Sequence, residues 1–417
     1  MSNSIALISL IILIACIAIG FVLKKNVGLI AILAAAIFGS VAGYSDSAII
    51  KGFISSTFIM LLGVSLLCTI ATNNGTLELA AKKFLRLTGG HVLFAPIIMY
   101  LIGYIVAAIG PGCVPALGIA AALSLPLGKS TGYNSVMLAA IGQIGSMAGR
   151  FSPITPESVL IYNLASEQGI TGYQEHTLIY ATVTTIILSV IIFLVFKGFQ
   201  IKEPQSKEKE ILSGFTQKQI LTLAGFVAMI VASAFFKRNV GLISFAVAVV
   251  LLLANVADEK VVIKGVPWST LLMVTGIGML MNIVSDVGGV DLMSNGLASI
   301  MTPKTAVAIQ GLSAGILSWF SSAIGVVWPT MVPTVGSIAA QVGVKPDGLI
   351  TIMCLTASFA GFSPASTGGS LIMAANATDP DFTKEKENKL FIQMFGLSGL
   401  LLFLTVLAGL LGVYNIL

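Results

Sequence analysis

The stretch GQIGSMAGRFSPITPES, residues 142–158, interrupts a segment that is otherwise apolar enough to cross a membrane. It contains Arg150, Glu157 and two prolines, which predict that a helix ends near Gly149. An arginine at the centre of a bilayer costs roughly 2.5–3.5 kcal/mol, so we expect Arg150 to face a cavity, a counter-ion or a substrate. Its guanidinium donors match a carboxylate. The alternative is that Arg150 forms a structural ion pair with Glu157 or reaches an interface.

The composition of the chain indicates a polytopic membrane protein. Of its 417 residues, 56% are hydrophobic and only 9% are charged, and the mean hydropathy is +1.00. These values exclude a soluble domain, and the modest net charge of +5 gives no reason to expect a nucleic-acid partner. Cys16, Cys68, Cys113 and Cys354 lie in apolar segments without CxxC spacing, which indicates neither a disulfide framework nor a transition-metal site.

The interrupted stretch has a counterpart in the second half of the chain. RFSP at Arg150–Pro153 matches GFSP at Gly361–Pro364, and KKNVGLI at Lys24–Ile30 recurs as KRNVGLI at Lys237–Ile243. Several matches in the same order, at nearly constant spacing, predict two collinear repeats. We place the first repeat at residues 1–196, a linker at 197–214 and the second repeat at 215–417.

Each repeat is predicted to contain five transmembrane helices and one re-entrant hairpin. In the first repeat, glycines and prolines at Ile109–Pro115 turn the chain within an apolar segment, and Ser321–Pro329 does so in the second. The alternative is that the segment around Ile109–Pro115 forms two complete spans. With five spans, an odd number, the second repeat is inverted relative to the first.

The distribution of lysine and arginine favours the hairpin and orients the protein. With this topology one side of the first repeat carries most of the positive charge, and Lys51 alone lies on the other side. If the segment around Ile109–Pro115 formed two complete spans, Lys129 and the linker would lie on opposite sides of the membrane and the charge difference between the sides would be smaller. The positive-inside rule then predicts a plasma (inner) membrane protein with a cytoplasmic linker and both termini outside. The residues on the positive side are Lys24, Lys25, Lys82, Lys83, Arg86, Lys129 and the five lysines from Lys197 to Lys218.

Inverted repeats with interrupted helices are typical of secondary transporters. Free amides at half-helix N-termini can bind an anion, and free carbonyls can bind a cation. We therefore predict symport of a small di- or monocarboxylate with Na⁺ or H⁺, without any other cofactor. A cap within its own helix is the alternative role for each hydroxyl. The expected substrate ligands are Arg150, Ser152, Thr155, Ser158, Gly110, Gly112, Ser321, Ser322, Ser363, Ser366, Thr367 and Ser370. The expected cation ligands are Gly110, Cys113, Gly149, Ser152, Ser322, Gly325, Gly361 and Ser363.

Two other functional classes fit the sequence less well. A Na⁺/H⁺ antiporter would be expected to carry acidic pairs at mid-membrane, whereas Glu157 is the one carboxylate placed deep in a span. An enzyme would need a nucleophile with a base or a metal cluster, and the chain has two histidines, at segment ends, and neither HExxH nor GxSxG. We therefore expect a carrier that is not an enzyme, with the antiporter as the second possibility.

Several motifs in the first 115 residues resemble the MatC-type malonate/dicarboxylate carriers. They are NVGLI at Asn26–Ile30, Gly52-Phe53, LLGVSLLCTIATNNGTLELA at Leu61–Ala80 and AIGPG at Ala108–Gly112. The whole plan is similar to the wider ion transporter superfamily, which includes divalent anion/sodium symporters. The resemblance implies a homodimer with a scaffold domain and a mobile transport domain, each drawn from both repeats, that work by an elevator movement.

The hairpin tips depart from the sodium-symporter branch of that superfamily. Its members carry Ser-Asn-Thr at both tips, whereas this chain has Gly110-Pro111-Gly112 and Ser321-Ser322-Ala323. The departure implies either that backbone carbonyls bind the sodium ion in place of side chains or that protons replace sodium as the coupling ion.

Overall fold

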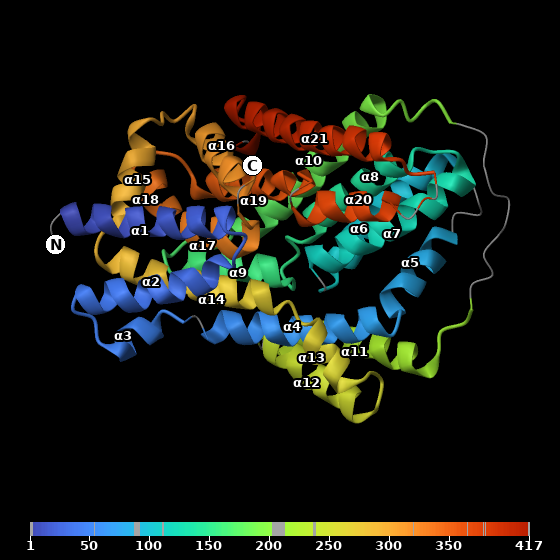
Figure 1. The fold of residues 1–417 in the computed structure, drawn as a ribbon, viewed down its shortest axis with the longest axis horizontal. Coiled ribbons are helices and arrows are strands. Elements are labelled where there is room, and N and C mark those ends of the chain that lie inside the picture. The colour runs from blue at the N-terminus through green and yellow to red at the C-terminus, as the bar shows by residue number, and fades with distance from the viewer. Residues whose placement is uncertain are drawn as a thin grey trace.

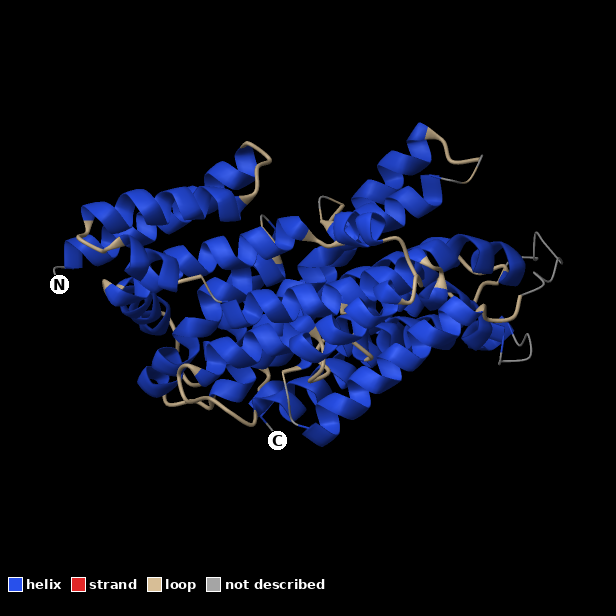
Figure 2. Cartoon of the chain, turned by 90° about the horizontal axis from the view of Figure 1, so that it is seen from below, coloured by secondary structure: helices blue, strands red, loops and turns tan. Residues whose placement is uncertain are grey.

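The computed structural model describes residues 3–53, 55–86, 92–110, 112–201, 213–236, 239–319, 321–364, 366–377, 379 and 381–415. Within these ranges the chain forms helices and connecting loops without any strand (Figure 2). Pro111 at the first hairpin turn and residues 202–212 of the predicted linker lie outside the described residues.

The helices of the two halves follow the same order along the chain. The first half contains α1 (Asn3–Val22), α2 (Val27–Val41), α3 (Asp46–Lys51), α4 (Ser55–Asn73), α5 (Thr76–Arg86), η1 (Val92–Phe94), α6 (Ala95–Ala108), α7 (Cys113–Thr131), α8 (Ser135–Gly149), α9 (Pro156–Ser166) and α10 (Tyr173–Val195). The second contains α11 (Gln217–Phe236), α12 (Val240–Leu253), α13 (Glu259–Gly265), α14 (Trp268–Asp286), α15 (Gly289–Ser299), α16 (Ala306–Trp319), η2 (Ala323–Val327), α17 (Trp328–Met331), η3 (Val332–Thr334), α18 (Val335–Val342), α19 (Pro346–Phe359), η4 (Ala360–Phe362), α20 (Thr367–Ala377), α21 (Lys384–Leu410) and η5 (Val413–Asn415).

The two halves interlock through one glycine contact that is made twice. A Cβ atom at Gly276 of α14 would lie 2.2 Å from the carbonyl oxygen of Gly28 in α2. A Cβ atom at Gly63 of α4 would lie 2.0 Å from the carbonyl oxygen of Gly241 in α12. Gly28 and Gly241 occupy equivalent positions in the two predicted repeats, as do Gly63 and Gly276. Gly28 of the first half thus contacts Gly276 of the second, and its equivalent Gly241 in the second half contacts Gly63 of the first. This reciprocal pattern is the one expected of two units related by a two-fold axis.

The outer helices expose large apolar side chains, as expected for a protein in contact with lipid. Examples are Ile14 of α1, Leu33 of α2, Ile187 of α10 and Phe403 of α21, each more than half exposed. Within the described residues, seven helical segments are long and apolar enough to cross a membrane. A multi-pass membrane protein is therefore confirmed.

The two predicted hairpins differ in local structure. In the first, α6 and α7 pack together on either side of a turn at residues 109–112. In the second, α16 is followed by η2, a π-helical turn, and then by the short helices up to Val342. The α7 arm has 19 residues and is itself long enough to cross a bilayer. The re-entrant path of the hairpin therefore stays a prediction.

The breaks in the two interrupted helices meet near the middle of the molecule. Figure 1 shows α9, α17 and α19 in this central region, with α1–α3 towards one end and α5 towards the other. The central helices bury most of their side chains; Trp328 and Phe359, for example, have no exposed surface. The fold therefore places the polar interruptions at a point surrounded by protein.

Candidate substrate-binding site

Arg150 and Glu157 flank a tight turn that separates α8 from α9. Thr155 closes this turn, because its hydroxyl donates to the carbonyl oxygens of Arg150 and Ser152 and accepts a hydrogen bond from the Ser158 amide at 3.2 Å. It is thus the N-cap of α9. The predicted helix break is confirmed, and it holds the two charged side chains next to each other.

Arg150 is almost fully buried and has three different neighbours. Its Nη2 lies 3.4 Å from Oε1 of Glu157, with the side chains only 8% and 4% exposed. Its Nη1 donates to the hydroxyl of Ser358 in α19 at 3.3 Å, and its guanidinium carbon lies 4.7 Å from the centre of the Trp328 ring. The ion pair of the alternative interpretation is therefore present. It does not use all the donors of the guanidinium.

The first hairpin contacts the same carboxylate. The backbone N–H of Cys113, the first residue of α7, donates to Oε1 of Glu157 at 2.8 Å. Gly112 has φ +76°, and a Cβ atom there would lie 2.4 Å from Oε2 of Glu157. The positive φ favours glycine at this position, and its lack of a side chain leaves room for the carboxylate. The positive end of the α7 dipole faces Glu157.

Three buried polar atoms of this cluster lack a hydrogen-bond partner among the described residues. They are Nε of Arg150, Nε1 of Trp328 and Oε2 of Glu157. More than about 90% of buried polar groups in proteins are paired, so three in one cluster call for a physical reason. Two of them are donors, which suit a carboxylate ligand, and one is an acceptor, which suits a proton or a cation.

The second break has the same local structure but no charged side chain. The Ser366 hydroxyl donates to the carbonyl oxygens of Gly361 and Ser363, as Thr155 does to those of Arg150 and Ser152. Thr367 and Ser370 are exposed, and the Ser370 hydroxyl donates to the carbonyl of Thr367 at 3.0 Å. These two side chains lie away from the buried cluster in this conformation.

The remaining predicted ligands mainly support local structure. Gly110 has φ +129° in the first turn, and Gly149 packs closely on the carbonyl of Tyr104. The Ser321 hydroxyl donates to the Leu317 carbonyl at 2.6 Å, and the Ser322 hydroxyl accepts from the Gly325 amide at 3.1 Å. A Cβ atom at Gly325 would lie 2.2 Å from the sulfur of Met273. Their role as substrate or cation ligands stays a prediction.

Two polar residues near the site were not anticipated from the sequence. Ser358 is one, and it lies in an apolar helix with no equivalent hydroxyl in the first repeat. Gln143 of α8 is the other, and its side chain is completely buried. Its amide nitrogen lies 3.4 Å from the Leu117 carbonyl in α7 and 3.0 Å from the Gly368 carbonyl in α20. Gln143 thus connects the first hairpin to the second break.

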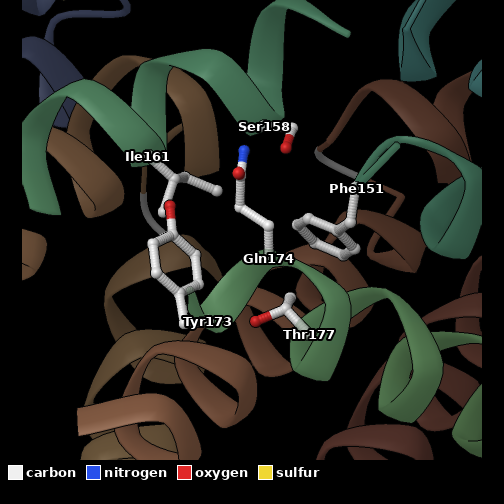
Figure 3. A pocket seen from close by; sticks show the side chains of 6 residues that line it. All are labelled: Phe151, Ser158, Ile161, Tyr173, Gln174 and Thr177. Atoms are coloured by element: carbon white, nitrogen blue, oxygen red, sulfur yellow. The ribbon is translucent and has the colours of Figure 1, made fainter. Parts of the chain in front are cut away.

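A cavity of about 10 Å³ is lined by Phe151 and Ser158, the chain neighbours of Arg150 and Glu157, and by residues of α9 and α10; it has room for about one water molecule. Figure 3 shows the Gln174 side chain extending towards Ser158 between Ile161 and Phe151. The hydroxyl of Tyr173 at this cavity has no hydrogen-bond partner among the described residues. The cavity is too small for an organic anion. The side chains of Arg150 and Glu157 are only 8% and 4% exposed, so the site is closed in this conformation.

The helical membrane fold and the buried charged site at interrupted helices define a transporter. The sequence matches the model of the citrate transporter family, CitMHS, over residues 8–357, and the chain belongs to that family. The family is part of the ion transporter superfamily expected from the motifs, whereas the specific malonate carrier is not confirmed. The protein is therefore a secondary carrier.

Solved transporter structures share the fold. One is the YdaH transporter of Alcanivorax borkumensis, with 12% identity, a TM-score of 0.59, and coverage of 88% of this chain and 87% of that chain. Another is MtrF of Neisseria gonorrhoeae, described as one of a class of antimetabolite efflux pumps. It has 15% identity, a TM-score of 0.55, and coverage of 87% and 82%. No curated protein matches the sequence significantly.

Proposed function

We propose that the protein carries small organic anions with carboxylate groups, such as citrate or a dicarboxylate, in symport with Na⁺ or H⁺. The observation that carries this proposal is the group of unpaired buried donors around Arg150, in a chain of the citrate transporter family. Arg150 Nε and Trp328 Nε1 are free to donate, and the N-terminus of α7 adds a backbone amide. All three favour a carboxylate over a cation or a neutral solute.

The cation is proposed to bind on the acidic side of the same cluster. Oε2 of Glu157 is buried and without a partner among the described residues, so it can accept a proton or contribute to a Na⁺ site. The carbonyl oxygens of Arg150, Ser152, Gly361 and Ser363 lie at the two breaks but already accept hydrogen bonds from Thr155 and Ser366. Glu157 is therefore the stronger candidate for coupling.

The transport movement is proposed to follow from the duplication. The reciprocal glycine contacts support two structural repeats, and we infer that these are inverted, with a cytoplasmic linker and both termini outside. We further propose that the protein is a homodimer and that a transport domain in each subunit moves against a scaffold domain. This arrangement would let the closed site open alternately to the two sides of the membrane.

Uptake into liposomes tests the proposed function. Purified protein should concentrate radiolabelled citrate, malonate or succinate when an inward Na⁺ or H⁺ gradient is imposed, and empty liposomes should not. Failure to accumulate any of these anions under either gradient would overturn the proposal.

The unpaired Oε2 of Glu157 also favours a second candidate, a Na⁺/H⁺ antiporter. A pH-sensitive dye inside the same liposomes distinguishes the two functions. Only an antiporter moves protons when Na⁺ is added without an organic anion, whereas a symporter requires the anion.

A further inference from the structure

The carboxylate of Glu157 lies where the carboxylate of a substrate is expected. Its Oε1 is 3.4 Å from Nη2 of Arg150 and accepts from the Cys113 amide at 2.8 Å. A guanidinium and a helix N-terminus are the donors with which proteins commonly hold an anion. We propose that Glu157 is a tethered carboxylate that fills the anion site of the empty carrier and that the substrate's carboxylate displaces. This proposal rests on the proposed function.

Displacement, rather than joint binding, follows from the space around the pair. Gly112 approaches Glu157 so closely that an added Cβ atom would lie 2.4 Å from Oε2. Trp328 is completely buried and its ring packs against the guanidinium. The Phe151 ring in turn packs against Trp328, with 6.1 Å between the two ring centres. The side chains of Arg150 and Glu157 are only 8% and 4% exposed. A second carboxylate therefore reaches Arg150 only after Glu157 has moved away.

Charge balance then links displacement to a proton. With Glu157 ionised, the pair is neutral, whereas a substrate carboxylate in its place would leave the displaced Glu157 as a second negative group in a buried region that holds one guanidinium. Like charges in low dielectric are costly, so the arrangement favours protonation of one carboxyl group. If Glu157 takes a proton from the aqueous phase at Oε2, the site is neutral again. On release of the anion, Glu157 returns this proton to water and pairs with Arg150 once more.

The groups around Glu157 make Arg150 its counter-ion. Among the described residues, the groups that interact electrostatically with Glu157 include Arg150 on α8, the Cys113 thiol on α7 and the Cys68 thiol on α4. The Cys354 thiol on α19 faces Arg150. The packed elements α17 and η3 contribute no titratable residue. Among the described residues, therefore, the charge of Arg150 is balanced either by Glu157 or by a bound anion.

Binding measurements on Glu157→Gln test this displacement. Glutamine keeps an oxygen that can accept from the Cys113 amide but carries no charge, so it should compete weakly for Arg150. We expect the full-length variant in detergent to bind citrate and succinate more tightly than the wild type at mildly alkaline pH, by on the order of tenfold. Measuring both proteins at the same pH cancels the ionisation of the anion itself from the ratio of the two dissociation constants.

A matched control removes a carboxylate from the other end of the same helix. Glu167→Gln, at the exposed C-cap of α9, should leave affinity and its pH dependence unchanged. If Glu157→Gln does not fold, Glu157→Asp keeps the charge on a shorter side chain and should bind with intermediate affinity.

The outcomes separate the two proposals. The tethered carboxylate would be overturned if Glu157→Gln bound the anions no more tightly than the wild type at alkaline pH. The same holds if Glu157→Asp, used in its place, bound them no more tightly than the wild type. In either case, binding by the wild type would still support a carboxylate carrier. Absence of binding by the wild type and by the variants would overturn both.

Discussion

Arg150 and Glu157 compensate each other in the closed site, and this sets what each substitution costs. Removing one member of a buried pair typically destabilises a protein by about 3–5 kcal/mol, because the other charge is left without a partner. Ion-pair geometry and substrate binding therefore depend on the same two side chains. Variants that keep the charge, Arg150→Lys and Glu157→Asp, avoid this cost.

Gly112→Ala tests the contact between the hairpin tip and Glu157. The new Cβ atom would lie 2.4 Å from Oε2 and the residue would have φ +76°, so either the tip or the Glu157 carboxylate must shift and their contact changes. We expect lower stability by about 1–3 kcal/mol and loss of anion uptake.

The matched control is Gly118→Ala in α7, where an added Cβ atom meets no atom within 4 Å. It should be neutral or slightly stabilising, by about 0.5–1 kcal/mol. Thermal unfolding followed by tryptophan fluorescence measures both variants. Equal stability of the two would mean that the tip does not depend on its contact with Glu157.

Single residues differ in how far the sequence reveals them. Arg150 and Glu157 are visible because a charge in an apolar segment requires a partner. The identity of that partner was open, since the sequence allowed either a substrate or an ion pair. Ser358 carries no such signal, because a hydroxyl within an apolar helix usually bonds to its own backbone, as this one also does to the Cys354 carbonyl. Its hydroxyl also accepts a hydrogen bond from Arg150, which is 208 positions away in the sequence.

At the scale of elements, α7 and α20 are connected at both of their ends. Gln143 bridges their backbones near the site, and Lys129 at the end of α7 lies 3.2 Å from Asp379 just after α20. The first hairpin and the second interrupted helix should therefore move as one unit.

Asp379→Asn tests the outer connection through its pH dependence. Hydrogen bonds from the Asp381 amide and from Lys129 lower the pKa of Asp379 below its usual range. A lowered pKa stabilises the folded state above the unfolded pKa, and this stabilisation is lost as the pH falls through the folded pKa. We expect the variant to be less stable at neutral pH by less than about 1 kcal/mol, because the pair is partly exposed.

The difference in melting temperature between the wild type and Asp379→Asn should decrease towards zero as the pH is lowered. A difference that grows as the pH falls would contradict this account. Lys129→Gln should follow the same pH profile, since it removes the other member of the pair.

The elements were predictable to different degrees. The break between α8 and α9 was predicted correctly, because prolines and a capping threonine mark it in the sequence. The π-helical turn at Ala323–Val327 was not anticipated. Its glycine approaches Met273 of α14, and such tertiary contacts leave no local pattern.

At the scale of the molecule, the interlocked glycines predict two equivalent substitutions. Gly276→Ala would place a methyl group against the Gly28 carbonyl, and Gly63→Ala would do so against Gly241. Each should destabilise the protein, by about 1–3 kcal/mol, through overpacking. Gly296→Ala in α15 is the control, because nothing lies within 4 Å of its added Cβ atom.

Melting temperatures of the three variants in one detergent measure this effect. Destabilisation by only one of the two central substitutions would contradict a shared contact between the halves. The two repeats are a prediction from the sequence, in which equivalent residues recur at nearly constant spacing. Which helices pack together could not be predicted, because the helices that meet are distant in sequence.

The central claim is that Arg150 binds the carboxylate of the transported anion. Its most direct test is uptake of radiolabelled citrate and succinate by liposomes containing either the wild type or Arg150→Lys, under the same imposed Na⁺ or H⁺ gradient. Lysine keeps the charge that Glu157 requires but loses the planar donors of the guanidinium. We expect the variant to fold and its initial uptake rate to fall by about 10- to 100-fold, while Lys129→Gln keeps the wild-type rate. Uptake by Arg150→Lys at the wild-type rate would contradict the claim.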